Sequence, residues 1–281
     1  MKIIRDISSL RGQVRCWRSD SKTVGLIPTM GSLHEGHLSL VQQAKQDCDY
    51  AIATIFVNPT QFAPSEDFDT YPRDEARDIA LLEEMGTDLL FSPDVTEMYA
   101  DGFSTSVSVS GLSECLCGAA RPHFFGGVAT VVSKLLLQSL PDRAYFGEKD
   151  FQQLQVIKRM ARDLNIPVEI QGVPTVREQD GLAMSSRNKY LSPGERGVAS
   201  TLYRVIQDVA QQFANGAQAE AILADGAATL RAAGFDPIDY LEIRDSETFE
   251  ALQTDNDKAR VFVAAFLGQT RLIDNTAVKS D

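Results

Sequence analysis

The feature that most constrains this fold is the alternation of strand-like and helix-like segments over the first two-thirds of the chain. Continuous apolar runs such as 50–57 (YAIATIFV), rich in β-branched and aromatic residues, are typical of strands buried on both faces. Strands separated by helices of this length predict βαβ units, and hence a doubly wound parallel α/β sheet. The predicted strands are 23–28, 50–57, 88–91, 143–147 and 168–172, and the predicted helices are 37–48, 74–85, 127–140 and 151–164.

The pattern changes near residue 180. Two consecutive helical segments, 193–216 and 217–233, are followed by three strand-like segments. Helices followed by strands, in place of alternation, predict a smaller C-terminal α+β domain. We therefore expect two domains, 1–176 and 177–281, which also suits a length of 281 residues at ~150 residues per domain. The three predicted strands of the second domain are 238–244, 260–267 and 270–273.

Charge and composition exclude several classes of function. The chain has 27 Lys and Arg against 39 Asp and Glu, a net charge of −12. This balance disfavours nucleic-acid binding and an electrostatic membrane anchor, because both depend on clustered basic residues. The longest clean apolar run, 261–267, is far shorter than the ~20 residues of a membrane helix.

The N-terminal residues and the cysteines predict a cytoplasmic protein. Charges interrupt the apolar residues of 1–17, so this segment does not resemble a signal peptide. Four cysteines are too few for a disulfide scaffold. Cys115 and Cys117, followed by His123, lack a fourth zinc ligand at a recognisable spacing, which favours buried or incidental cysteines.

The first candidate site lies after the first predicted strand, because open α/β sheets bind ligands beyond the carboxyl ends of their strands. The segment 28–37 (PTMGSLHEGH) holds two of the three histidines, His34 and His37. Gly31 and Gly36 allow the backbone to approach a ligand closely. The start of the following helix favours an anion, so imidazole N–H donors beside it suit phosphate oxygens.

Other interpretations of this segment are weaker. A helix cap with two surface histidines is the ordinary alternative. The zinc-protease pattern HExxH is excluded, because Leu38 stands where the second histidine would be needed.

Two further segments contain residue types that suit phosphate. In 145–150 (YFGEKD), Lys149 supplies a compact positive charge and Asp150 is a plausible helix cap, although a solvated helix start is the alternative. In 181–188 (GLAMSSRN), at the domain junction, two hydroxyls and Arg187 could fold over a polyphosphate, with a polar hinge loop as the alternative.

These motifs resemble a known family. His34-Glu-Gly-His37 matches the HxGH signature of the nucleotidyltransferase superfamily, and Met184-Ser-Ser-Arg187 resembles its KMSKS-type loop. HxGH alone would be a weak signal, but several longer strings closely resemble the pantothenate synthetase family and occur in the expected order over almost the whole chain. These strings are PTMGSLHEGH, FVNPTQF (56–62), YPRD (71–74), YFGEKD, MSSRN and RLIDN (271–275).

The resemblance implies a Rossmann-like HxGH fold and a ligase reaction. Such enzymes join pantoate to β-alanine, with ATP converted to AMP and diphosphate through a pantoyl adenylate. An in-line displacement at phosphorus leaves little covalent work to the protein, so positioning and charge stabilisation dominate. Mg²⁺ is implied as the companion of ATP. The resemblance also implies a homodimer.

The resemblance assigns roles to individual residues. His34 and His37 would contact the ATP phosphates, with His37 favoured as the group that supports charge on the α-phosphoryl. Lys149 would neutralise phosphate and bring the pantoate carboxylate to phosphorus. The implied ATP-binding residues are Met30, Gly31, Ser32, Leu33, His34, Glu35, Gly36, His37, Gly147, Glu148, Lys149, Asp150, Val176, Met184, Ser185, Ser186 and Arg187.

The remaining implied residues concern the other substrates and the metal. Amide side chains suit a hydroxy acid, because an amide both donates and accepts. Asp78 is the one candidate for contact with magnesium. The three valines are, equally well, ordinary core residues. The residues implied for pantoate and β-alanine are Gln61, Gln153, Asn58, Val128, Val131 and Val132.

One segment departs from the family pattern. The family usually has RPGHF, one residue, and then Gly-Val, whereas this chain has RPHFFGGV at 121–128. Aligned on Gly127, the histidine position of the family holds Phe124, and His123 stands one place earlier. A basic residue of some members is replaced by Gly126.

Three alternative functions are disfavoured. A cytidylyl- or adenylyltransferase acting on a phosphorylated small molecule would share HxGH but has no reason to retain Gln61 and Gln153 together with YFGEKD. A tRNA-charging enzyme conflicts with the acidic balance. A non-catalytic nucleotide-binding or scaffold protein does not require all of His34, His37, Lys149 and Arg187.

Overall fold

The computed structural model describes residues 1–63, 68–254 and 256–278. The chain divides into two compact units. The first comprises Met1–Ser113, Arg121–Glu148 and Gln152–Pro174, and the second comprises Glu114–Ala120, Lys149–Phe151 and Thr175–Asp281. Two short pieces that precede residue 175 therefore cluster with the C-terminal unit.

The first unit is built on a six-stranded parallel sheet. The chain proceeds from β2 through β3 to β4 toward one edge and from β5 to β6 toward the other, so the direction reverses between β2 and β5. Ligands of such sheets bind at this switch point. In spatial order the strands are β1 (Lys2–Ile4), β4 (Leu89–Phe91), β3 (Tyr50–Ile55), β2 (Val24–Thr29), β5 (Arg143–Gly147) and β6 (Glu169–Val173).

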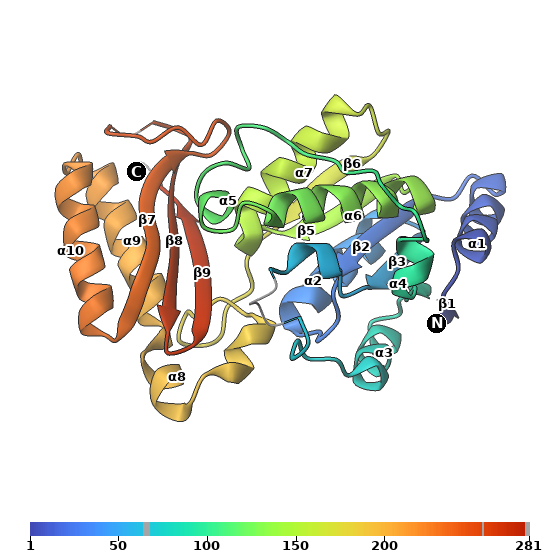
Figure 1. The fold of residues 1–281 in the computed structure, drawn as a ribbon, viewed down its shortest axis with the longest axis horizontal. Helices are drawn as coiled ribbons and strands as arrows, with labels where there is room; N and C mark the ends of the chain where they lie inside the picture. Colours follow the sequence, from blue (N-terminus) through green and yellow to red (C-terminus); the bar gives the residue numbers. More distant parts are fainter. Residues whose placement is uncertain (64–67, 255, 279–281) are drawn as a thin grey trace. The chain divides into compact units, whose positions relative to one another are not determined.

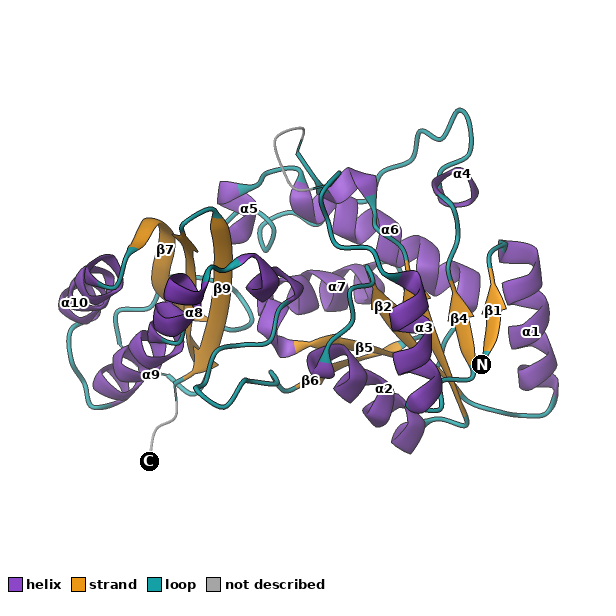
Figure 2. Cartoon of the chain, turned by 90° about the horizontal axis from the view of Figure 1, so that it is seen from below, coloured by secondary structure: helices purple, strands orange, loops and turns teal. Residues whose placement is uncertain are grey.

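Helices cover both faces of this sheet. Figure 1 shows α2 (Glu35–Asp47) and α3 (Glu75–Glu84) on one side, with α6 (Phe124–Ser139) and α7 (Phe151–Asp163) on the other. Figure 2 shows the first two helices lying over the same side of their strands, as right-handed βαβ crossovers require. An additional helix, α1 (Ile7–Ser19), packs against α6.

The core of the first unit explains the apolar runs. On β2, Leu26 and Ile27 are fully buried, and on β3 Ala51 and Ala53 are as well, because both faces of these strands are covered. Apolar side chains of α2, spaced three or four residues apart, pack onto this sheet. They are Leu40, Val41 and Ala44.

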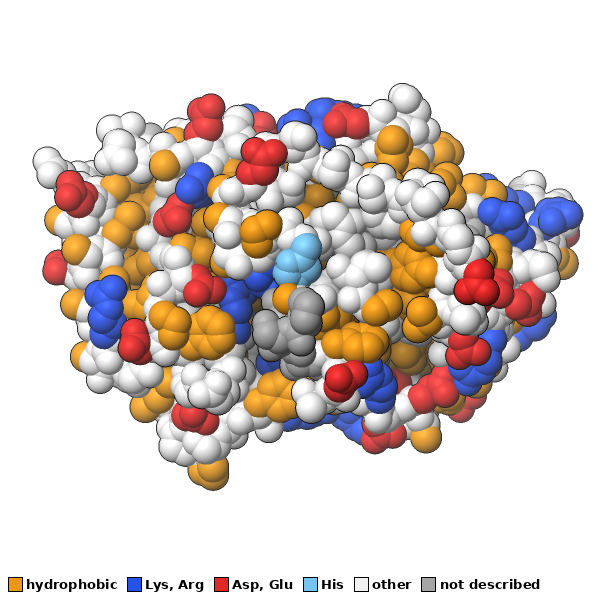
Figure 3. Space-filling view, in the orientation of Figure 1, with side chains coloured by type: hydrophobic (Ala, Val, Ile, Leu, Met, Phe, Trp, Pro, Cys, Tyr) orange, Lys and Arg blue, Asp and Glu red, His pale blue; other side chains and the backbone are white. Residues whose placement is uncertain are grey.

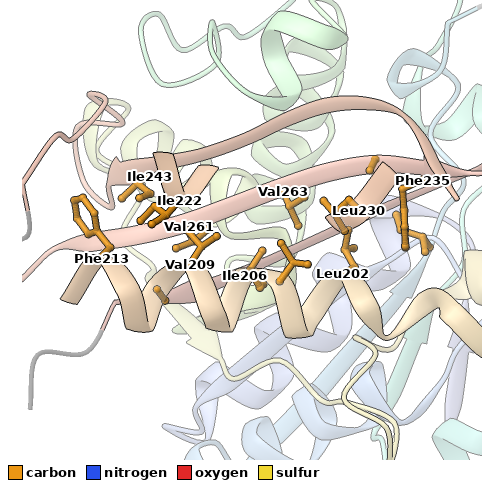
Figure 4. Close-up of a cluster of buried hydrophobic side chains, with 14 of the residues drawn as sticks. Leu202, Ile206, Val209, Phe213, Ile222, Leu230, Phe235, Ile243, Val261 and Val263 are labelled. Carbon is orange, nitrogen blue, oxygen red and sulfur yellow. The ribbon is translucent and has the colours of Figure 1, made fainter. Parts of the chain in front are cut away.

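The second unit is an antiparallel sheet covered by helices. Its strands β7 (Phe235–Asp245), β8 (Ala259–Leu267) and β9 (Thr270–Ala277) are neighbours in chain order. The helices α9 (Thr201–Ala214) and α10 (Ala219–Ala232) pack on the sheet and on each other, preceded by α8 (Pro193–Ala199). Figure 4 shows the apolar side chains between α9 and β8, which include Leu202, Ile206, Val209, Phe213, Val261 and Val263.

The predicted fold class is confirmed, and the differences are local. The single helix expected over 193–216 is two helices that meet at Ser200. Apolar spacing does not reveal such a break, because one residue suffices to make it. The sequence pattern also did not identify β1, which has only three residues, or α1, whose buried positions are Leu10, Val14 and Trp17.

One face of the molecule carries charges of both signs. On the face shown in Figure 3, Lys and Arg side chains lie interspersed with Asp and Glu. Among the helices of the described residues, none has both the length and the apolar character that a bilayer crossing demands.

Adjacent leucines of α6 provide a matched test of the core. Leu136 is 0% exposed and Leu137 is 50% exposed. We expect Leu136→Ala to lower the free energy of unfolding by about 2–5 kcal/mol, because it removes buried methyl groups and leaves a cavity. Leu137→Ala should change it by less than about 0.5 kcal/mol. Chemical denaturation of both variants measures the difference, and equal effects would contradict the placement of this helix.

Candidate active site

The turn between β2 and α2 has an unusual backbone. Gly31 and Ser32 have positive φ values of 81° and 51°, in the left-handed region. A Cβ on Gly31 would lie 3.0 Å from Oδ2 of Asp78 and 3.1 Å from Cγ2 of Ile55. Both the dihedral angle and the crowding therefore require glycine at this position.

Asp78, on α3, holds this turn in place. Its side chain is 1% exposed, and its two oxygens accept the backbone N–H groups of Ser32 (2.7 Å) and Leu33 (2.8 Å). Arg77 donates to the carbonyl of Leu33 at 3.2 Å. Burial raises the pKa of the Asp78 carboxyl, and the two N–H bonds and the Arg77 charge oppose that rise. Two consecutive residues of α3 thus brace the turn.

The two histidines lie side by side at the start of α2. His34 is the N-cap residue, and its Nδ1 accepts the N–H of Gly36 at 3.2 Å. A nitrogen that accepts carries no proton, so this bond places the proton of a neutral His34 ring on Nε2. The ring centroids of His34 and His37 are 4.1 Å apart. Both half-buried imidazoles therefore sit where the helix dipole and backbone N–H groups attract anions.

Residues 30–37, which the family resemblance assigns to ATP binding, thus lie partly in the turn and partly in α2. Met30 is half-buried, whereas Ser32 and Leu33 are buried. Glu35 and Gly36 form the first two residues of α2.

Asn58 orients Gln61 at the end of β3. Asn58 is fully buried and donates from Nδ2 to Oε1 of Gln61 at 3.0 Å and to the carbonyl of Gly127 at 3.1 Å. Its Oδ1 accepts from the hydroxyl of Tyr99 at 2.8 Å. Since the carbonyl oxygen of Gln61 accepts from Asn58, its amide NH₂ group is directed elsewhere and can donate to a substrate. A residue implied for substrate binding, Asn58, is thus placed to support its neighbour.

A close backbone contact completes this group. A Cβ on Gly127 would lie 2.4 Å from the carbonyl oxygen of Thr60, so α6 approaches the short helix η1 (Pro59–Gln61) only because glycine stands there. Val128, Val131 and Val132 follow on the same helix and are all buried.

The segment that departs from the family pattern has a defined structure. The guanidinium carbon of Arg121 lies over the ring of Phe124, 4.0 Å from the ring centroid. Arg121 also donates to the carbonyl of Gln61 at 3.1 Å. His123 is exposed at the N-terminus of α6. Phe124 thus helps to hold an arginine that contacts the Gln61 backbone.

The end of β5 continues into a second cluster of implied residues. Gly147 ends the strand, and Glu148, Lys149 and Asp150 form the short helix η2 (Glu148–Asp150) before α7. The half-buried Lys149 has its Nζ 3.7 Å from Oδ2 of Asp150. The next glutamines differ: Gln152 is buried and donates to the carbonyl of Leu112, whereas Gln153 is half-buried.

The second unit contains the remaining implied residues. The N–H of Met184 donates to the carbonyl of Val176 at 3.0 Å, which closes 176–184 into a loop. Ser185 caps the short helix η3 (Ser186–Tyr190) by accepting the N–H of Arg187 at 3.3 Å. Ser186 is buried, and Arg187 is half-buried.

The residues implied by the family resemblance therefore divide between the two units. In the first unit, the turn 30–34, the helix η1 and residue 148 follow β2, β3 and β5, which are adjacent strands of the sheet. Lys149 and 176–187 belong to the second unit. Within the described residues, no group of three or more His, Cys, Asp and Glu side chains is arranged to hold a metal.

Comparison with known proteins identifies the family. The family model described as "Pantoate-beta-alanine ligase" matches residues 2–277. The chain belongs to this family. The resemblance seen in the motifs is confirmed. The ligase chain is 54% identical over 277 residues to the pantothenate synthetase of Paramagnetospirillum magneticum, covering 99% of this chain and 98% of that protein. It is 56% identical over 279 residues to that of Caulobacter vibrioides, covering 98% of each.

Solved structures agree with this assignment. The ligase chain matches the pantothenate synthetase of Thermus thermophilus with a TM-score of 0.94 and 48% identity, covering 99% of each chain. It matches the pantoate–β-alanine ligase of Francisella tularensis, solved in complex with "Beta-gamma ATP and Beta-alanine", with a TM-score of 0.83 and 33% identity. That match covers 99% of this chain and 97% of the other.

Several supporting residues were not found from the sequence. Tyr99 donates to Asn58 from a segment with no recognisable motif, and the contact of Arg121 with the Gln61 carbonyl cannot be read from the string 121–128 that contains it. Asp78 was considered for magnesium, and its contacts with the turn carry no local signal. Asp274 and Asn275 lie in the family string RLIDN, which by itself indicates no contact with another segment.

Two glycine substitutions test the turn. Gly31→Ala should destabilise the ligase by at least about 1 kcal/mol, because alanine disfavours the left-handed region and its Cβ would crowd Asp78. Gly12→Ala, in an open position of α1, should stabilise it by up to about 1 kcal/mol through helix propensity. Denaturant titrations of both variants measure the change in the free energy of unfolding and its sign. A Gly31→Ala protein as stable as the parent would refute the described turn.

Proposed function

We propose that this ligase catalyses the ATP-dependent condensation of (R)-pantoate with β-alanine to pantothenate, AMP and diphosphate. The observation that carries the proposal is the family match over residues 2–277, together with relatives above 50% identity that cover nearly the whole chain. The Francisella tularensis relative, solved with an ATP compound and β-alanine, supports the same substrates.

The first step is attack on ATP. An oxygen of the pantoate carboxylate forms a bond to the α-phosphorus, the bond from that phosphorus to the β-bridging oxygen breaks, and diphosphate leaves. His34 and His37 donate N–H groups to the phosphate oxygens at the start of α2, with His37 supporting the charge that develops on the α-phosphoryl. Lys149 neutralises phosphate and draws the carboxylate toward it. Preorganised donors of this kind lower the barrier because they need no rearrangement during reaction.

The second step is amide formation. The amine of β-alanine attacks the acyl carbon of pantoyl adenylate, the bond from that carbon to the phosphate oxygen breaks, and AMP leaves. The nitrogen loses a proton to complete the amide. In this proposal Gln61 contacts both substrates, and Asn58 fixes its side chain by donating to Oε1.

Pantoate is recognised by amides and by an apolar wall. Gln61 and Gln153 bind its hydroxyls and carboxylate, because amides supply both donors and acceptors. Val128, Val131 and Val132 contact its gem-dimethyl group. The loop 176–187 closes over the β- and γ-phosphates, with Arg187 supplying bidentate donors.

Magnesium is proposed as the companion of ATP. Both oxygens of Asp78 accept backbone N–H groups, and the described residues provide no further carboxylate cluster. This donor set fits a cation held mainly by phosphate oxygens and water, with at most one contact from Asp78. When bound, such an ion neutralises phosphate charge.

The proposed enzyme also has a cellular compartment and an oligomeric state. We place it in the cytoplasm, where ATP is available and where its four cysteines, which form no disulfide among the described residues, stay reduced. We also propose a homodimer, on the basis of the family.

Product analysis tests the function directly. The purified ligase should release diphosphate from ATP only with pantoate present, and form pantothenate and AMP when β-alanine is added. Transfer of a nucleotide to a phosphorylated alcohol, with no response to pantoate, would instead identify a nucleotidyltransferase of the wider superfamily.

Substitutions test the assigned residues. His37→Ala and Lys149→Ala should each lower turnover about 10²–10³-fold, because each removes a preorganised donor. The exposed His123 and Lys158 provide controls with the same residue types, and their alanine variants should retain parental turnover. Steady-state kinetics on folded protein decides, and a Lys149→Ala enzyme with near-parental turnover would remove that residue from the mechanism.

A further inference from the structure

The main chain at Lys149 is held by a buried asparagine of β9. Asn275 is 4% exposed, and its Nδ2 donates to the carbonyl of Lys149 at 2.9 Å. Its Oδ1 accepts from Arg260 of β8. The guanidinium carbon of Arg260 lies 3.8 Å from the ring centroid of Phe151. One amide and one guanidinium thus hold both ends of the segment 149–151.

Asp274, the residue before Asn275, holds the loop 176–187 through Arg177. Asp274 is 3% exposed and accepts two hydrogen bonds from Arg177, at 2.7 and 3.0 Å. Arg177 also donates to the carbonyl of Gly181 at 3.1 Å and lies 3.6 Å from the ring centroid of Tyr203. Burial raises the pKa of the Asp274 carboxyl, and the charges of Arg177 and Lys149 oppose that rise. The loop 176–187 is therefore tied to the same strand.

We infer that Asp274 and Asn275 are positioning residues, which fix the loop 176–187 and the catalytic Lys149 to the rigid strand β9. The inference rests on the proposed function for the roles of Lys149 and 176–187. β9 is rigid at this point because Asp274 and Asn275 pair with Val263 and Phe262 of β8. Adjacent residues of one strand have a fixed separation, so the lysine and the loop keep their mutual geometry within the second unit.

The substitution Asn275→Asp tests the contact between Asn275 and the carbonyl of Lys149. It retains an oxygen acceptor for Arg260 but replaces the NH₂ donor with an oxygen that repels the carbonyl of Lys149. We expect kcat to fall about 10²-fold, the loss typical of a displaced catalytic group, with KM for ATP changed by less than about threefold. Asn215→Asp, an exposed position after α9, makes the same charge change and should leave both constants unchanged.

Hydrogen exchange gives a readout that does not depend on activity. Amides of the peptide spanning 148–152 should exchange faster in Asn275→Asp than in the parent or in Asn215→Asp. Should the charged variant not fold, Asn275→Ser carries the same expectation. A kcat within about threefold of the parent, or unchanged exchange, overturns the inference. If the parent enzyme itself shows no response to pantoate, the proposed function fails, whereas the exchange result still decides whether Asn275 orders this segment.

The substitution Arg177→Lys tests the contact that ties the loop 176–187 to Asp274. Lysine keeps the charge beside Asp274 but loses the two-pronged donor geometry. We expect KM for ATP to rise about tenfold, with the melting temperature little changed, because the loop loses its fixed position while the charge pair survives. Arg231→Lys, exposed near the end of α10, is the matched control. An unaltered KM for ATP in Arg177→Lys overturns this half of the inference.

Discussion

The histidine-bearing end of the first unit depends on one buried carboxylate. The left-handed turn at Gly31 and Ser32 directs the successive N–H groups of Ser32 and Leu33 to the buried carboxylate of Asp78. A buried N–H without an acceptor costs about 1–3 kcal/mol, and the two oxygens of Asp78 meet both groups. Because His34 follows this turn directly, the position of both imidazoles is set by a residue of α3.

The same arrangement recurs at the other site segments. A buried amide contacts a residue assigned to the site in both cases: Asn58 donates to the side chain of Gln61, and Asn275 donates to the backbone carbonyl of Lys149. Functional groups are held most accurately when their supports are themselves fully bonded and packed. Phe124 contributes in a different way, since its ring packs against Arg121, which donates to the carbonyl of Gln61. Each of these segments therefore has a buried support of its own.

Much of the fold could be predicted from the sequence. Apolar runs in β2 and β3 and the helical spacing of α2 identified a parallel sheet, since these patterns reflect burial that each segment imposes locally. The break at Ser200 and the three-residue β1 escaped prediction, because both are too short to alter a periodic pattern. Short strands form only when a neighbour, here β4, offers a paired edge.

The sequence by itself determined the fold class and the family and proposed the candidate site residues, because motifs and burial patterns are local properties of the chain. Only the tertiary structure decided which distant residues support them. Asp78 acts on a turn more than forty residues earlier, and Asp274 on Arg177 from 97 residues away. Such contacts leave no periodicity or spacing in the sequence, since they exist only after the elements have packed and buried groups must find partners.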